Sequence, residues 1–168
     1  RVPMNVEITL GAKRDGTLMG KRMRVVADNG AYSSHGPGLL SSGSTKGDSA
    51  YRIRNVDTEG LLVYTNKVAT SAFRGYGSPQ ITFALESQMD VLAEELGIDP
   101  VQLRLQNSIR TGDVTVHGHT IHSGGTHLCL ERAQQILPPL SGGGAKRKRG
   151  RGYACAIHVS GARVFGNW

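Results

Sequence analysis

The strongest structural signal in the sequence is one amphipathic helix over residues 78–96. We expect Ser78 as its N-cap and Pro79 at its first helical position, where a fixed φ and a missing N–H are tolerated. Gly97 is expected to end the helix. One apolar stripe marks its packing face: Ile81, Leu85, Met89, Leu92 and Leu96. The acidic residues away from this stripe are expected to form a solvated face: Glu86, Asp90, Glu94 and Glu95.

Strands are expected on the N-terminal side of this helix. Residues 6–10 alternate apolar and polar side chains, residues 13–16 hold an Asp-Gly turn, and residues 18–26 continue as a second strand. This pattern predicts a β-hairpin, with Lys21, Arg22 and Arg24 on a solvated face. Residues 60–64 predict a further strand. Residues 28–50 are rich in Gly, Ser and Pro and predict an irregular connection.

Two shorter helices and one strand are expected after residue 97. Asp99-Pro100 predicts a helix that runs to about Asn107, and residues 126–137 predict a helix that two prolines end. Residues 153–159 predict a buried strand. The expected fold class is therefore α+β, with a β-hairpin and further strands packed against two or three helices.

Composition favours one loop-rich domain. Of 168 residues, 23 are glycine and 38% are apolar, and this glycine content is about double the usual share. We expect residues 1–140 to form the domain, residues 141–151 a basic Gly-rich linker, and residues 152–168 the start of a following strand region. Because both ends of the sequence resemble the interior of a longer protein, the chain is expected to be an internal fragment.

The sequence also indicates where the protein is located and what its two cysteines do. No run of residues reaches the roughly 20 apolar positions of a membrane span, and no secretion signal is visible, so a cytoplasmic setting is the default expectation. Cys129 and Cys155 have no partner at metal-ligand spacing. Both are expected to be small buried groups.

The positive charge is local. The formal net charge is +7, but five basic residues lie within residues 146–151, a Gly-flanked stretch that reads as a flexible tether. No aromatic residue interleaves with them before Tyr153. We therefore expect at most non-specific attraction to nucleic acid.

The segment SAFRGYGSPQ, residues 71–80, gathers the most functional residue types. Gly75 and Gly77 allow positive φ and a close approach of the backbone to another molecule. Arg74 and the free N–H groups of the following helix start favour an anionic ligand. Phe73 and Tyr76 can stack on a flat organic molecule. A cofactor or substrate site is therefore expected here.

Two other interpretations of this segment stay open. Phe73 and Tyr76 could be core residues while Arg74 caps a helix or a carbonyl group. Residues 74–77 also match the start of an RNA-binding signature, but Pro79 and the missing aromatic residues do not fit the strand that this signature requires.

With these motifs in view, the chain resembles the molybdenum hydroxylases, the family of xanthine dehydrogenase, aldehyde oxidoreductase and 4-hydroxybenzoyl-CoA reductase. The resemblance rests on Thr65-Asn66, on residues 72–77 with Pro79 and Gln80, on residues 27–32, and on Asp99-Pro100, Leu103-Arg104 and Asn107. It covers nearly the whole chain except the basic linker. It implies part of the molybdopterin-binding domain of a larger subunit. Tyr76 and residues 154–161 lean toward the aldehyde and aromatic acyl-CoA branches, 4-hydroxybenzoyl-CoA reductase above all.

The resemblance also implies site residues and cofactors. Ala72, Phe73, Arg74 and Gly75 would bind a molybdenum–molybdopterin cofactor, in a dinucleotide form, and Tyr76 and Gly77 would face a small organic substrate. Iron–sulfur centres and a flavin would belong to partner subunits or domains, together with the remainder of the large subunit. The family's catalytic glutamate has no counterpart here, so no catalytic residue is assigned. The isolated chain is expected to bind cofactor poorly and to be inactive.

Two further interpretations complete the predictions. His117, His119, His122 and His127 could gather around a metal ion, but a solvated loop is favoured because no cysteine or carboxylate lies at ligand spacing. No metal ligand is therefore assigned.

As an alternative to an enzyme, the chain could be a non-catalytic module that binds an anion or a partner through the loop of residues 71–80.

Overall fold

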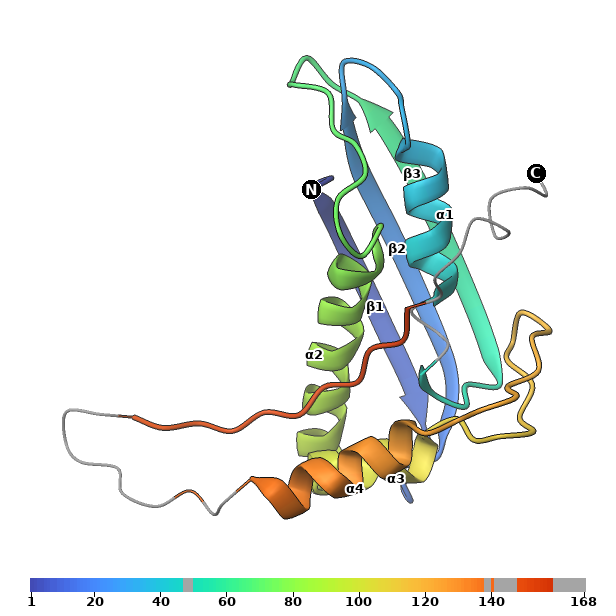
Figure 1. Cartoon of the computed structure of the whole chain (residues 1–168), viewed down its shortest axis with the longest axis vertical. Helices are drawn as coiled ribbons and strands as arrows, with labels where there is room; N and C mark the ends of the chain where they lie inside the picture. Colours follow the sequence, from blue (N-terminus) through green and yellow to red (C-terminus); the bar gives the residue numbers. More distant parts are fainter. Residues whose placement is uncertain (47–49, 138–139, 141–147, 159–168) are drawn as a thin grey trace.

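The computed structural model describes residues 1–46, 50–137, 140 and 148–158. Its centre is a three-stranded sheet of β1 (Met4–Ala12), β2 (Leu18–Gly30) and β3 (Asn55–Tyr64), in the order β1-β2-β3. Strands β1 and β2 are antiparallel, as the hairpin prediction requires, and β3 runs parallel to β2. Four helices accompany these strands in the described part of the chain (Figure 1). The α+β class is confirmed.

The hairpin forms where the Asp-Gly turn predicts it. Gly16 has a φ of 86°, which only glycine adopts without strain. The Asp15 carboxylate accepts a hydrogen bond from the Thr17 N–H at 2.9 Å, and this bond lowers the pKa of Asp15. The turn therefore fixes the register of β1 against β2.

Residues 28–50 are not an irregular connection, so that prediction is wrong. Strand β2 continues to Gly30, and helix α1 (Gly36–Lys46) follows. Helix α1 bridges the parallel strands β2 and β3, which a short turn could not join. Its glycines lower helix propensity but permit close packing, because a Cβ on Gly43 would lie 3.1 Å from the Gly77 carbonyl group.

Helix α2 (Ser78–Leu96) confirms the long amphipathic helix, but its N-cap is Gly77 and not Ser78. Gly77 has a φ of 88°, and no side chain caps the helix. The Ser78 hydroxyl is buried without a hydrogen-bond partner. The apolar stripe packs as expected: Ile81, Leu85 and Met89 are buried, and Ala93 completes the face.

The expected solvated acidic face of α2 is wrong at Glu86, which is buried. Its carboxylate accepts hydrogen bonds from the Tyr51 hydroxyl at 2.7 Å and from Arg104 Nε at 2.8 Å. The Arg104 side chain is fully buried and also pairs with Asp90 at 2.8 Å. Burial and the Glu86 charge raise the pKa of Tyr51. Burial lowers the pKa of Arg104, but its bonds and charge interaction with Glu86 outweigh burial, so that pKa is raised.

The C-terminal helices form as predicted. Helix α3 (Pro100–Asn107) begins after Asp99, whose side chain accepts hydrogen bonds from the Val101 and Gln102 N–H groups. Helix α4 (Thr126–Ile136) ends one residue before the expected boundary. The strand expected at 153–159 is absent from its described part, because residues 148–158 form neither helix nor strand.

Two single-residue expectations also need correction. Lys21 is buried, because strand alternation places it on the opposite face from Arg22 and Arg24. Those two arginines are exposed and pair with Asp57 and Glu59 on β3. Cys155 is buried as expected, whereas Cys129 is exposed on α4.

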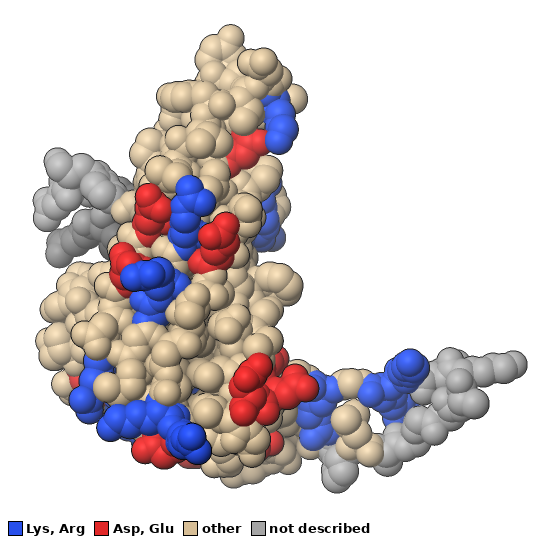
Figure 2. Space-filling model, turned by 180° about the vertical axis from the view of Figure 1, so that it is seen from behind, with Lys and Arg blue, Asp and Glu red and all other residues tan. Residues whose placement is uncertain are grey.

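The surface carries mixed charge where the structure describes it. Figure 2 shows basic and acidic side chains next to one another on one face. Most of the expected basic linker, residues 141–147, lies outside the described residues, as do residues 159–168; Lys148, Arg149 and Arg151 are exposed. Within the described ranges, no helix has the length and apolar character to cross a membrane.

Candidate functional site

The segment 72–77 forms a turn against the start of α2. The Tyr76 N–H donates to the Phe73 carbonyl and the Ser78 N–H donates to the Gly75 carbonyl, both at 2.9 Å. Gly75, Tyr76 and Gly77 have φ values of 93°, 44° and 88°. Three successive positive φ values reverse the chain sharply just before the helix. The two glycines make this turn possible.

The first half of the turn is exposed and rich in hydrogen-bond donors. Ala72, Phe73 and Arg74 are all exposed. Among the described residues, no acceptor is bound by their backbone N–H groups or by the Arg74 guanidinium. By contrast, Pro79 has no N–H and the Ser78 N–H is already bonded. The hydrogen-bond donors available to a ligand therefore come mainly from the turn. The helix start, which was expected to contribute free N–H groups as well, contributes little.

Arg1 braces the turn from the N-terminal side. Its Nη1 donates to the Arg74 carbonyl at 2.6 Å. Its guanidinium lies 4.8 Å from the centre of the Phe73 ring, a cation–π contact. The Arg74 main chain is thus held while its own charged group stays exposed. The interpretation of Arg74 as a cap for a helix or carbonyl group is not supported.

The second half of the turn faces α1. The half-buried Tyr76 side chain packs against the core cluster that contains Leu39 and Leu40 of α1 and Ile81 of α2. Gly77 is buried, and a Cβ there would lie 2.5 Å from the Leu39 carbonyl oxygen. The close approach expected for Gly77 is therefore made to α1 of the same chain. The Tyr76 side chain is therefore packed on one side and partly exposed on the other, two positions after the exposed Arg74.

A set of hydrogen bonds to Asp28 holds the segment that leads into the turn. The mostly buried Asp28 carboxylate accepts hydrogen bonds from Thr65 Oγ1 and Lys67 Nζ, each at 2.6 Å. The Gly30 N–H also donates to it, and Thr70 bonds the Asp28 carbonyl. The Lys67, Thr65 and Gly30 bonds lower the pKa of Asp28 to about 2. The end of β2 thereby fixes residues 65–70.

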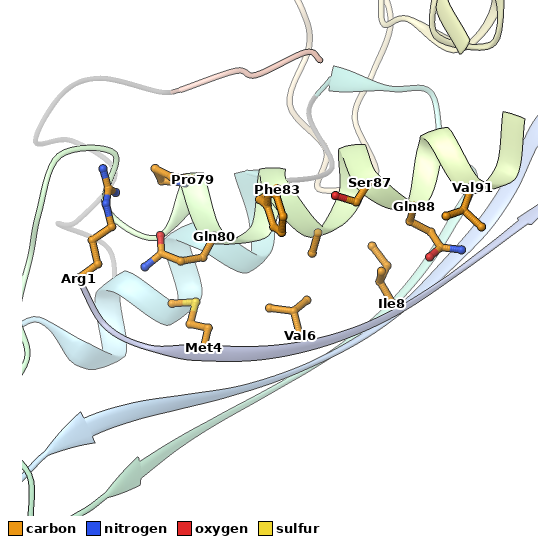
Figure 3. Close-up of a pocket in the computed structure, with 11 residues that line it drawn as sticks. Arg1, Met4, Val6, Ile8, Pro79, Gln80, Phe83, Ser87, Gln88 and Val91 are labelled. Atoms are coloured by element: carbon orange, nitrogen blue, oxygen red, sulfur yellow. The ribbon is translucent and has the colours of Figure 1, made fainter. Parts of the chain in front are cut away.

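A groove of about 590 Å³ begins beside the turn and runs between β1 and α2 (Figure 3). Arg1 and Pro79 stand at one end, and Met4, Val6 and Ile8 project from β1 toward the helix. Its lining is mainly apolar, and Phe83 is 77% exposed at its rim. Like the Ser78 hydroxyl, Gln80 Oε1 is buried near the turn without a hydrogen-bond partner, while Gln80 Nε2 donates to the Val2 carbonyl.

The histidine segment lies elsewhere and forms a surface loop. Val114 pairs with Thr120 across a tight turn, and His117, His119 and His122 are exposed. In the described residues, no three His, Cys, Asp or Glu side chains gather as a metal site. The structure therefore brings none of these imidazoles to the turn.

Comparison with known proteins identifies the family. Residues 1–108 match the model of the molybdopterin cofactor-binding domain. The chain belongs to this family. It is 35% identical, over 99% of its length, to the putative xanthine dehydrogenase molybdenum-binding subunit XdhA of Escherichia coli, and 43% identical, over 70%, to the aldehyde oxidoreductase of Megalodesulfovibrio gigas. These alignments span 24% and 13% of the two relatives, so the chain corresponds to a quarter or less of their length.

Solved structures agree with this family membership. The aldehyde oxidoreductase of Desulfovibrio gigas superposes with a TM-score of 0.77 and 38% identity, over 80% of this chain and 15% of that one. The carbon monoxide dehydrogenase of Oligotropha carboxidovorans, at 22% identity and a TM-score of 0.68, shares the fold. The molybdenum hydroxylase resemblance, with its xanthine dehydrogenase and aldehyde oxidoreductase members, is thus confirmed.

The residues of the turn fit the cofactor of this family. A molybdopterin is a flat, anionic group rich in hydrogen-bonding atoms. Unpaired backbone N–H groups at residues 72–74 and an exposed guanidinium supply donors and positive charge for such a group. The sequence predicted these residues as the site, but it gave no indication of the contacts with Arg1, Asp28 and α1 that hold the turn. In the sequence, residues 27–32 and Thr65 are separate motifs. In the structure, the hydrogen bonds of Asp28 join them in the segment that leads into the turn.

Proposed function

We propose that this chain supplies the turn of residues 72–77 to the cofactor and substrate site of a molybdopterin-dependent oxidoreductase. In this proposal Ala72, Phe73, Arg74 and Gly75 bind the cofactor, and Tyr76 and Gly77 face the substrate. The single observation that carries it is the exposed, donor-rich first half of the turn, held in a domain of the molybdopterin cofactor-binding family. When bound, the molybdenum cofactor supplies the redox chemistry of substrate hydroxylation or of its reverse.

Each half of the turn has a separate task in this proposal. The Arg74 guanidinium binds an anionic part of the cofactor, because a charge-assisted hydrogen bond is stronger than a neutral one. The Arg1 bond to the Arg74 carbonyl keeps the main chain of the turn in place during binding. Phe73 and Tyr76 exclude water from this charge, which strengthens the attraction.

The proposed substrate is a small aldehyde, an aromatic heterocycle or an aromatic acyl-CoA. Relatives described as xanthine dehydrogenase, aldehyde oxidoreductase and nicotinate dehydrogenase act on small carbonyl or aromatic compounds by their names. The aromatic side chain of Tyr76 suits a flat substrate. We further propose a dinucleotide form of the cofactor, iron–sulfur and flavin partners, and a cytoplasmic enzyme. The catalytic base belongs to the remainder of the large subunit, and the 168-residue chain alone is inactive.

Replacement of Arg74 tests this function. In the cofactor-loaded enzyme, Arg74→Ala should weaken cofactor binding about 10- to 100-fold, the effect of losing one charge-assisted hydrogen bond. Arg132→Ala is the matched control, because Arg132 is exposed on α4 and, among the described residues, bonds only Gln135. Molybdenum is measured by plasma mass spectrometry and pterin by fluorescence after oxidation. Equal molybdenum and pterin contents in the two variants would contradict the proposal.

A further inference from the structure

His35, the residue just before α1, holds the side chain of Tyr76. The Nδ1 atom of His35 lies 3.2 Å from the Tyr76 hydroxyl oxygen. The two rings also meet edge to face, with centroids 5.9 Å apart and an interplanar angle of 79°. His35 is itself anchored to the helix, because its carbonyl accepts the Leu39 N–H at 2.9 Å. One polar and one aromatic contact therefore join Tyr76 to the start of α1.

Tyr76 needs such support because its backbone is unfavourable. Its φ of 44° is the only positive value of a non-glycine residue in the described ranges. A bulky side chain in this region persists only when its surroundings hold it. α1 also leaves room for the hydroxyl group, since a Cβ on Gly38 would lie 2.9 Å from the Tyr76 oxygen. The glycine at position 38 thus has a specific role in the orientation of Tyr76.

We propose that His35 is a positioning residue that holds the Tyr76 side chain in the orientation in which it meets the substrate. This inference rests on the proposed function, in which Tyr76 faces the substrate.

Variants of His35 distinguish the effect of its hydrogen bond to Tyr76 from the effect of its side-chain size. In His35→Asn the amide oxygen stands near the position of Nδ1, so the bond to Tyr76 is kept. In His35→Gln the amide reaches the position of Nε2 instead, so the bond is lost at similar polarity. Gly38→Ala provides an independent route, because its methyl group displaces the Tyr76 hydroxyl while both partners remain.

The first measurement needs no turnover. In intact protein labelled with ¹⁵N-histidine, we expect Tyr76→Phe to shift the His35 Nδ1 resonance, which the His35→Asn spectrum assigns. Tyr32→Phe is the control, because Tyr32 is 77% exposed and lies three residues from His35, yet the described structure shows no hydrogen bond or ring contact between the two. An unchanged His35 resonance in Tyr76→Phe overturns the inference.

The second measurement is a double-mutant cycle on kcat/KM of the cofactor-loaded enzyme, with benzaldehyde and quinoline as probe substrates. We expect His35→Gln and Gly38→Ala to lower kcat/KM about 3- to 10-fold, the effect of one neutral hydrogen bond, and His35→Asn to restore it. In a Tyr76→Phe background the His35 change should have no further effect. Molybdenum content must match wild type in all variants.

The outcomes distinguish the inference from the proposed function. A Tyr76→Phe effect without any His35 or Gly38 effect overturns the inference alone. A moved His35 resonance combined with no kinetic effect of Tyr76→Phe, or with no turnover of either probe, counts against the proposed role of Tyr76. In that case the inference fails with it.

Discussion

Replacement of Gly77 by alanine probes how α1 and the turn fit together. Gly77 has a φ of 88°, and an alanine Cβ would meet the Leu39 carbonyl oxygen at 2.5 Å and the Gly43 Cα at 3.3 Å. Gly97 offers a matched control, because its φ is 66° and a Cβ there meets nothing within 4 Å. Both substitutions carry the backbone cost of a left-handed residue. Only Gly77→Ala adds an overlap with a neighbouring helix.

The expected magnitudes follow from these two terms. A non-glycine residue in the left-handed region costs about 1–2 kcal/mol, so Gly97→Ala should lose about that much stability. Overpacking against main-chain atoms adds about 1–3 kcal/mol. Gly77→Ala should therefore be the more destabilising change by about 1–3 kcal/mol, because the backbone of Leu39 and Gly43 must move to relieve the overlap.

Hydrogen exchange with mass spectrometry measures this difference in the intact protein. Amides of α1 and of residues 72–78 should exchange about 5- to 100-fold faster in Gly77→Ala than in Gly97→Ala, since 1.4 kcal/mol corresponds to a factor of ten. Cofactor content should fall in the same variant. If the two alanine variants protect α1 equally, the packing of this helix on Gly77 does not hold the turn, and our reasoning is wrong.

Two further predictions test the buried charges. Glu86→Gln should destabilise the protein by about 3 kcal/mol in chemical denaturation, because the buried Arg104 guanidinium loses the buried one of its two carboxylate partners and keeps only the exposed Asp90, whereas the exposed control Glu95→Gln should change stability by less than about 0.5 kcal/mol. Equal effects would refute the network. The lowered pKa of Asp28 stabilises the fold above its unfolded value of about 3.9, and this contribution disappears as pH falls toward the folded value of about 2. Hydrogen exchange of residues 65–70 should therefore accelerate over pH 4 to 2 beyond its intrinsic pH dependence, but Asp28→Asn should show no such step; a step in both proteins would argue against this role.

The sequence predicted the local elements well because their signals are local. The Asp-Gly turn, the apolar stripe of α2 and the Asp99-Pro100 start all act within a few residues, and each forms as expected. Helix α1 was missed because residues 36–46 contain three glycines and three serines, which are poor helix formers. Its stability comes from contact with Gly77 and the sheet, and no local pattern reports such contacts.

The same distinction explains the site. The residue types of the segment 72–77 predicted a ligand-binding turn, and the structure leaves Arg74 exposed there. Glu86 was misassigned because helical spacing shows which residues share a face, but it does not show that Arg104 and Tyr51 cover that face. The contact of His35 with Tyr76 joins residues 41 positions apart and depends on α1, so the sequence alone gave no indication of it.

The most direct test of the proposed function is an experimental structure of the cofactor-loaded enzyme at a resolution that places the pterin. We predict pterin or phosphate oxygen atoms within about 3 Å of the Arg74 guanidinium or of the backbone N–H groups of residues 72–74. We also predict that the Tyr76 ring borders the substrate side of the same cavity. A cofactor bound elsewhere, with this turn facing only solvent, would contradict the account.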